Sequence, residues 1–140
     1  MVRISDIELI KLLMENSRRP YIELARRLGV TEAAVRKRIK RLEERGIIRR
    51  YSIEVDPRKL GYEVVAFIGV DVAPEHYLRL MEDLKRREEV VNLYSTSGDH
   101  MLIAECWFKN SSELSAFIKE LERSNEVSRV CPAIVIEKVK

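Results

Sequence analysis

The 140-residue sequence contains no glutamine and is poor in cysteine, glycine and proline. Cys106 and Cys131 are its only cysteines, too few for a disulfide framework, and we expect both thiols to be reduced and buried. No apolar run is long enough for a membrane span or a signal peptide, so we expect a cytoplasmic protein. Abundant Arg, Glu and Lys beside scarce Asn and Gln are often found in proteins from hot environments.

Residues with catalytic or metal-binding spacing are also missing. His76 and His100 are the only histidines, and the sequence has no Cys-x-x-Cys or His-x-x-x-His pair. Gly69 and Gly98 are isolated, which excludes a glycine-rich phosphate loop. Cys106 lies in an apolar stretch typical of a buried strand. The sequence therefore predicts neither an enzyme nor a protein with a metal or organic cofactor.

Positive charge is concentrated in the first part of the chain. Residues 1–60 carry 16 Lys and Arg against 9 Asp and Glu, whereas residues 61–140 carry 10 against 14. The two parts thus have net charges of +7 and −4, although the whole chain has only +3. This asymmetry is typical of a protein of which one part binds a polyanion. We expect a basic domain over residues 1–55, a linker over 56–61 and a second domain over 62–140.

Three short helices are predicted in the basic domain. The first is indicated by apolar residues at helical spacing, namely Ile7, Ile10 and Met14, with Leu9, Leu12 and Leu13 widening the apolar face. Pro20 and Gly29 are typical of the start and the end of the second. The third runs from about Thr31, a good N-cap, to about Arg45. Its apolar stripe consists of Val35, Ile39 and Leu42.

The second and third helices have the pattern of a helix-turn-helix. The small Ala25 permits a close crossing of the two helices, and the turn lies at Gly29 and Val30. A basic helix taken alone is better explained as an ion-paired surface, because Glu32, Glu43 and Glu44 can pair with some of its charge. The arrangement around the helix favours DNA binding. We expect the DNA contacts to be made by Thr31, Glu32, Ala33, Arg36, Lys37, Lys40, Arg41, Arg49 and Arg50.

Side-chain chemistry divides these residues by role. The first turns of a recognition helix meet base edges, where Arg36 can bridge guanine and Glu32 can accept from cytosine. Lys40 and Arg41 are better placed for phosphates. Alternating residues from Tyr51 to Val55 predict a strand that forms a wing. Arg49 and Arg50, which lead into it, should contact the DNA backbone.

The second domain has a βαββαβ pattern. Strands are predicted near residues 64–72, 90–96, 101–108 and 127–139, with helices after the first and the third. The fold class is therefore α+β, with an N-terminal winged helix-turn-helix and a C-terminal ferredoxin-like domain of the RAM type. Two helices cover only one face of such a sheet. We expect the other face, including Phe67 and Trp107, to be buried against a second copy, and Pro132 to lie on an edge strand.

The whole chain resembles the Lrp/AsnC (feast/famine) family of transcriptional regulators, here of an archaeal and thermophilic kind. The resemblance is carried by residues 21–31, by residues 35–48 and by the βαββαβ half. It implies homodimers that bind double-stranded DNA, are joined through the second domain, and assemble into tetramers, octamers or higher forms. It also implies amino acids or related metabolites as effectors at interfaces between dimers.

The family's effector loop commonly reads Thr/Ser-Gly-Asp-Tyr-Asp. In this chain the first three positions match, and a histidine and a methionine replace the last two. The start of the last strand, from an opposing dimer, commonly closes the pocket. The effector-binding residues implied by the resemblance are Ser97, Gly98, Asp99, His100, Met101, Val130, Cys131 and Pro132.

We therefore expect a sequence-specific regulator, and more specifically a repressor of its own promoter or of amino-acid metabolism genes, which blocks the transcription machinery. A weakly specific architectural protein that compacts DNA is the alternative, since it would share both halves. A steep salt dependence with little sequence preference would favour that alternative. A pure ligand sensor is disfavoured by the +7 charge of the first half.

Overall fold

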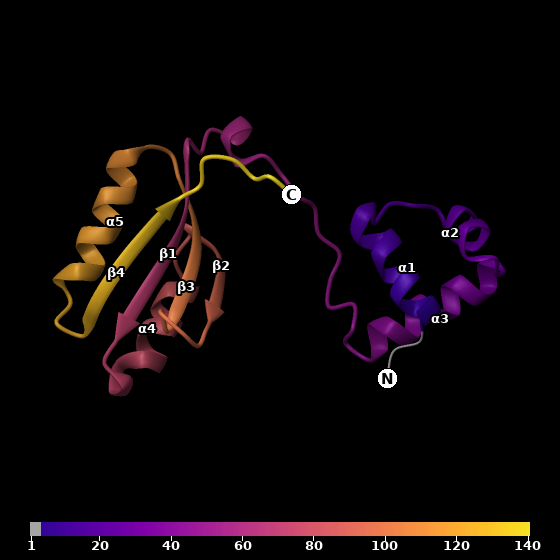
Figure 1. The fold of residues 1–140 in the computed structure, drawn as a ribbon, viewed down its shortest axis with the longest axis horizontal. Helices are drawn as coiled ribbons and strands as arrows, with labels where there is room; N and C mark the ends of the chain where they lie inside the picture. The colour runs from indigo at the N-terminus through magenta and orange to yellow at the C-terminus, as the bar shows by residue number, and fades with distance from the viewer. Residues whose placement is uncertain (1–3) are drawn as a thin grey trace. The chain divides into compact units, whose positions relative to one another are not determined.

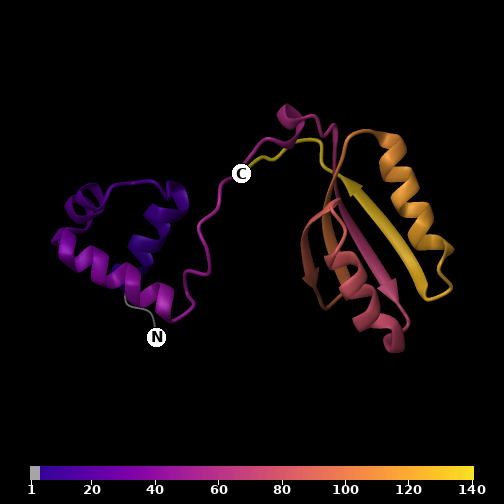
Figure 2. The ribbon, with the colours of Figure 1, turned by 180° about the vertical axis from the view of Figure 1, so that it is seen from behind.

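The computed structural model describes residues 4–140, and the chain divides into two compact units between Glu54 and Val55. Figures 1 and 2 show the ribbon from opposite sides. The first unit is helical, and the second combines a sheet with helices, so the predicted α+β class is confirmed. Within the described residues no helix is long and apolar enough to cross a membrane.

The first unit consists of α1 (Ile4–Glu15), α2 (Tyr21–Leu28) and α3 (Glu32–Glu44). The predicted limits of α2 are confirmed: Pro20 precedes it in extended conformation, and Gly29 ends it with φ 67°. This left-handed φ lets the N–H of Val30 return to the carbonyl of Ala25 at 3.0 Å. Thr31 caps α3, since its Oγ1 accepts from the Ala34 N–H at 3.1 Å.

The core of this unit joins all three helices. Leu9, Leu24, Val35 and Leu42 are fully buried, and the small Ala25 is 6% exposed in the same cluster. The apolar face predicted for α1 is confirmed in part, because Leu9 is buried and Ile10, Leu12 and Leu13 pack against the same cluster. Met14, which is 81% exposed, and Ile7, which is 42% exposed, were expected on this face but are not buried. Because apolar residues surround most of α1, only contact with α2 and α3 decides which of them are buried.

The strand predicted from Tyr51 to Val55 is wrong. Residues 49–56 form neither helix nor strand, and Tyr51 and Ile53 are exposed. A strand acquires its hydrogen bonds from a neighbour. No other strand lies in the described part of this unit, so the segment has no partner with which to form the backbone hydrogen bonds of a sheet. The wing is thus an irregular segment, with Arg49 and Arg50 exposed at its start.

The segment predicted as a linker, residues 56–61, lies within the second unit. It contains the 3-10 helix η1 (Pro57–Leu60), which is capped by the Asp56 carboxylate and ended by Gly61 at φ 100°. The Arg58 guanidinium donates to the carbonyls of Val135 at 2.7 Å and Ile136 at 2.9 Å. These bonds attach η1 to the end of the chain.

The second unit contains β1 (Val64–Val72), η2 (Pro74–His76), α4 (Tyr77–Lys85), β2 (Val90–Ser95), β3 (Leu102–Phe108), α5 (Ser111–Arg123) and β4 (Val127–Ile134). Its antiparallel sheet has the order β2-β3-β1-β4, which confirms the βαββαβ topology. Pro132 lies on the edge strand β4, as predicted. That strand ends at Ile134 and not at Val139, because it pairs with β1 only as far as Ala66.

Both helices pack against one face of the sheet. The core between them includes Ile68, Leu84, Leu102, Phe108 and Phe117. Cys106 is fully buried in this core, and burial raises the pKa of its thiol to about 12, which makes it unreactive. Cys131 is half-buried. The opposite face of the sheet, which we call the open face, carries Phe67, 39% exposed, and Trp107.

Candidate functional site

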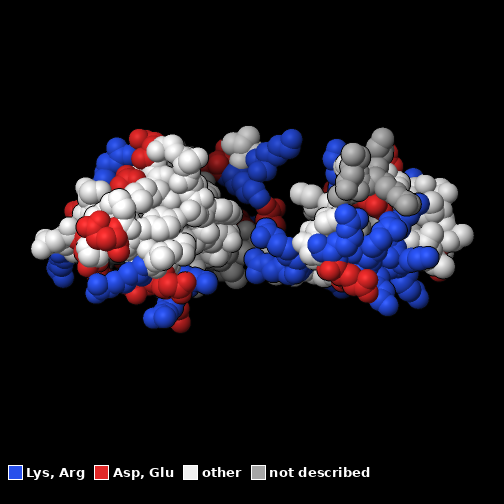
Figure 3. Space-filling view, turned by 90° about the horizontal axis from the view of Figure 1, so that it is seen from below, with Lys and Arg blue, Asp and Glu red and all other residues white. Residues whose placement is uncertain are grey.

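The outer face of α3 is the strongest candidate for a nucleic-acid interface. The core stripe of α3 points toward α1 and α2, so its remaining faces are available to a partner. All nine predicted contact residues except Arg41 are exposed. In Figure 3, Lys and Arg side chains gather on the helical unit, with few acidic side chains among them. For Arg36, Lys37 and Lys40 no ion pair occurs within the described residues.

Arg41 differs from the other basic residues of α3. Its Nη2 lies 3.4 Å from Oδ2 of Asp6, which is 2% exposed and belongs to α1. The guanidinium is therefore partly neutralised and helps to hold α1 against α3. Nothing in the spacing of the two residues, 35 positions apart, indicated this pair.

Two tyrosines that the sequence reasoning missed also lie near α3. The guanidinium carbon of Arg36 is 5.2 Å from the ring centroid of Tyr21, a cation–π distance. Partial burial, followed by the charge of the nearby Glu43 carboxylate, raises the pKa of Tyr51.

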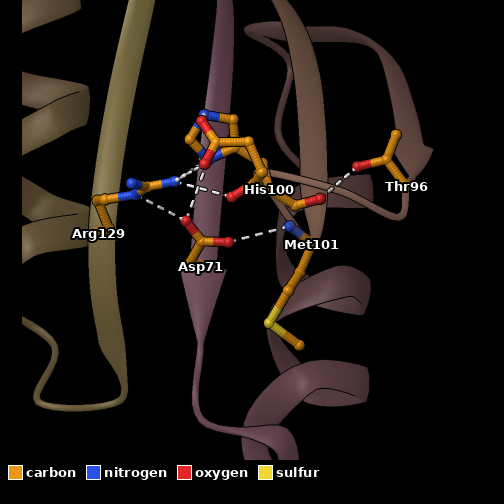
Figure 4. A network of polar contacts seen from close by, with 6 residues as sticks. Asp71, Thr96, His100, Met101 and Arg129 are labelled. Carbon is orange, nitrogen blue, oxygen red and sulfur yellow. Dashed lines mark hydrogen bonds and ion pairs between the residues drawn. The ribbon is translucent and has the colours of Figure 1, made fainter.

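A second candidate site lies on the second unit, where β1, β4 and the loop between β2 and β3 meet (Figure 4). Asp71 Oδ2 is 3.0 Å from His100 Nδ1 and 3.0 Å from Arg129 Nε. Arg129 Nη2 also donates to the carbonyl and the carboxylate of Asp99, at 2.7 and 3.0 Å. We call these four side chains the loop network.

Within the loop network, the positive charge of Arg129 offsets the negative charges of Asp71 and Asp99 through ion pairs and hydrogen bonds. Burial alone raises the pKa of Asp71, but bonds from His100, from the Met101 N–H and from Arg129 together bring the pKa below its ordinary value. Bonds to Asp99 and then to Asp71 raise the pKa of Arg129. The Thr96 hydroxyl donates to the carbonyl of His100 at 2.6 Å and so fixes the loop from its other end.

Gly69 explains how the histidine lies on the sheet. It sits in the middle of β1, and a Cβ at this position would clash with the imidazole ring of His100. An isolated glycine inside a strand often marks such a close approach. Gly69 is paired with Cys131 of β4, so the ring over Gly69 lies next to the position of Cys131 in the sheet.

The predicted effector residues are only partly brought together. Ser97, Gly98 and Asp99 form the exposed loop, with Gly98 at φ 112°. The side chains of Met101 and Val130 instead pack against the core of the second unit. Asp71 and Arg129 were not predicted, because only strand pairing brings them beside the loop. Within the described residues no cluster of His, Cys, Asp or Glu could hold a metal ion.

Known proteins resemble this chain over both units. Residues 3–49 match the family model for winged helix-turn-helix DNA-binding domains, and residues 65–140 match the Lrp/AsnC ligand binding domain. The HTH-type transcriptional regulator LrpA of Pyrococcus horikoshii is 43% identical over 141 residues and covers 100% of both chains. The regulator LrpA1 of Halobacterium salinarum is 36% identical, over 97% of this chain and 96% of its own.

Solved structures have the same fold. The transcriptional regulator NMB0573 of Neisseria meningitidis, in complex with L-Met, superimposes with a TM-score of 0.88 at 23% identity, over 100% of this chain and 93% of its own. AsnC of E. coli gives a TM-score of 0.84 at 26% identity, over 100% of this chain and 95% of its own.

Proposed function

The chain belongs to the Lrp/AsnC family of DNA-binding transcriptional regulators. From this family membership we propose a function for each of its domains. The matched relatives are regulators and not enzymes. Residues 1–55 act as the DNA-binding domain and 62–140 as the dimerisation and effector domain, and residues 56–61, which lie within the second unit, act as the linker that connects them. The observation that carries the proposal is the exposed basic face of α3, opposite an apolar core that fixes the helix in place.

The first turns of α3 enter the major groove. Arg36 bonds to guanine O6 and N7, Glu32 accepts from cytosine N4, and Ala33 contacts a thymine methyl group. Thr31 and Lys37 flank these contacts. All of these side chains are exposed on the described surface of the unit, and none is taken up by its core.

The remaining basic residues bind phosphates. Lys40, Arg49 and Arg50 are exposed and contribute affinity and salt dependence without sequence choice. Arg41 also faces the DNA backbone, with part of its charge shared with Asp6.

The open face of the sheet pairs with a second copy of the chain. A partly exposed phenylalanine and the neighbouring Ile103 and Trp107 give this face the apolar character of an interface. A two-fold dimer matches a pseudo-palindromic site with half-sites about 34 Å apart, or a multiple of that. Dimers then assemble into tetramers, octamers or higher forms.

An amino acid acts as effector at the loop from Ser97 to Met101, with Val130, Cys131 and Pro132 contributed by a neighbouring dimer. The loop network offers both charges that a zwitterion needs. The Asp99 carboxylate can bind the ammonium group of an amino acid, and the Arg129 guanidinium can bind its carboxylate. A bound amino acid would thus replace the ion pair between Asp99 and Arg129 with one ion pair to each residue. The structure of the Neisseria regulator contains L-Met, a ligand of this chemical class.

Regulation follows from occupancy of DNA. The protein acts in the cytoplasm as a repressor of its own promoter or of amino-acid metabolism genes, because bound oligomers block the transcription machinery. The effector shifts the oligomer and hence the half-site spacing that the protein prefers.

Selection of bound duplexes from a random pool, at near-physiological salt, tests this proposal. We expect one enriched pseudo-palindrome, whose binding then changes when single amino acids are added. Asp99→Asn should abolish that change and leave DNA binding intact, whereas Glu75→Gln, an acidic residue outside the loop network, should leave both intact. No enrichment, with a steep salt slope, would instead identify an architectural protein that compacts DNA.

A further inference from the structure

Tyr21 and Arg36 come from different helices of the DNA-binding unit and meet at its surface. Tyr21 is the first residue of α2 and is 36% exposed, and its ring centroid lies 5.2 Å from the guanidinium carbon of Arg36 on α3. No other arginine stacks on an aromatic ring in the described part of this unit. Within the same residues Arg36 has no carboxylate partner at ion-pair distance.

A contact with an aromatic ring, unlike an ion pair with a carboxylate, leaves the N–H groups of an arginine free to donate hydrogen bonds. A guanidinium that stacks on an aromatic ring uses its flat face, while its N–H groups point outward in the plane. A carboxylate would occupy those N–H groups, as Asp6 does for Arg41. Tyr21 therefore restricts the position of Arg36 and leaves its bidentate edge available for a base.

The benefit of this restriction is preorganisation. Arginine has a long side chain, and binding must otherwise remove much of its rotamer freedom. A free arginine can also reach acceptors on adjacent base pairs, which blurs the preference at each. A held arginine is directed at one base step.

We propose that Tyr21 is a positioning residue that sets the base preference of Arg36. The proposal rests on the proposed function, in which Arg36 reads a base edge. Tyr21 acts through its ring and not through its hydroxyl group, and it acts only through Arg36.

The location of Tyr21 makes it suitable for substitution. Its side chain does not belong to the buried cluster of the unit, which draws on Leu24 and Ala25 of the same helix. Leucine at position 21 retains an apolar side chain and removes the ring, and phenylalanine retains the ring. Tyr51→Leu is the matched control, since it replaces another exposed tyrosine of this unit that has no stacked arginine.

The experiment selects duplexes from a random pool with the full-length protein and its variants, and compares base preference at every position of the enriched site. Arg36→Ala identifies the position that Arg36 reads. At that position Tyr21→Leu should lower discrimination about two- to fivefold, the effect of an exposed cation–π contact. Tyr21→Phe and Tyr51→Leu should retain it. Affinity for random DNA and the salt slope should not change, and Tyr21→Leu should add nothing to Arg36→Ala.

Three results would overturn the proposal. If Tyr21→Leu weakens all sequences alike, or still acts in the Arg36→Ala background, Tyr21 works through the fold or through a phosphate. If Tyr21→Phe loses the preference, the hydroxyl and not the ring is responsible. If Arg36→Ala changes no base preference, the base-reading role in the proposed function fails first, and this result is recognisable because it does not involve Tyr21.

Discussion

Gly69→Ala tests the close approach of the imidazole to the sheet. Gly69 pairs with Ile103 and Cys131 in the middle of the sheet, so its backbone cannot move away from the ring. The ring of His100 is itself held by Asp71 at 3.0 Å. A methyl group at position 69 must therefore displace the ring or strain the strand.

The cost follows from these two routes. Overpacking of a well-packed site costs about 1–3 kcal/mol. Displacing the ring gives up its bond to Asp71, about 0.5–1.5 kcal/mol for a typical hydrogen bond. The cheaper route sets the loss, so we expect Gly69→Ala to lower the free energy of unfolding of the second unit by about 0.5–1.5 kcal/mol. In a domain of this size, that lowers Tm by roughly 2–12 °C.

The double variant supplies the decisive comparison. His100→Ala alone should cost about 1 kcal/mol through its lost bond, and it empties the space above Gly69. Adding Gly69→Ala to it should then cost nothing more. The two substitutions are thus coupled by about 0.5–1.5 kcal/mol in a double-mutant cycle.

Urea denaturation measures these values. Trp107 is the only tryptophan and lies in β3, so its fluorescence reports the unfolding of the second unit. Protomer concentration must be kept constant, because the open face is a proposed dimer interface. If the double variant loses the sum of the two single losses, the ring does not rest on Gly69 and the reasoning is refuted.

Four further predictions concern other parts of the molecule. Arg36→Ala should relax preference at one base step, whereas Arg49→Ala should weaken binding to all sequences and reduce the salt slope by about one, as titrations at several salt concentrations will show. Phe67→Asp should raise the dimer dissociation constant on the order of tenfold or more, measured by sedimentation; an unchanged constant would place the interface elsewhere. The pKa of Asp71 is lowered in the folded state, so its contribution to stability is present above its unfolded value of 3.8 and is lost as the pH falls through the lower folded value. Asp71→Asn should remove that acid dependence from urea denaturation curves, and a wild-type acid limb would contradict the assignment. Ala25→Leu should destabilise the first unit by about 1–3 kcal/mol, measured by circular dichroism, because it overpacks the core beside α3; no loss would mean that the helices do not cross closely there.

Much of the fold was predictable because its signals are local. Pro20, Gly29 and Thr31 act through their own backbone or the next turn, so the limits of α2 and α3 follow from the sequence alone. The apolar strands and the amphipathic helices of the second half likewise determine the βαββαβ order. The basic residues of α3 were identified for the same reason, since helical periodicity separates its core stripe from its outer face.

Features that depend on a neighbour were mispredicted or missed. The alternation from Tyr51 to Val55 resembles a strand, but pairing requires a partner that sequence periodicity does not supply. The exposure of Met14 depends on which side of α1 contacts the other helices. The contact between Tyr21 and Arg36 depends on the crossing of α2 and α3.

The sequence by itself determined the order of the helices and of the four strands of the sheet, which surface is basic, and which loop follows β2. Tertiary structure alone decided the composition of the loop network. Arg129 reaches Asp71 across 58 positions of sequence because β4 pairs with β1, and Gly69 admits His100 because the loop folds back over that strand. Such contacts arise from strand register and chain reversal, which place distant residues within hydrogen-bond reach and leave no periodic trace in the sequence.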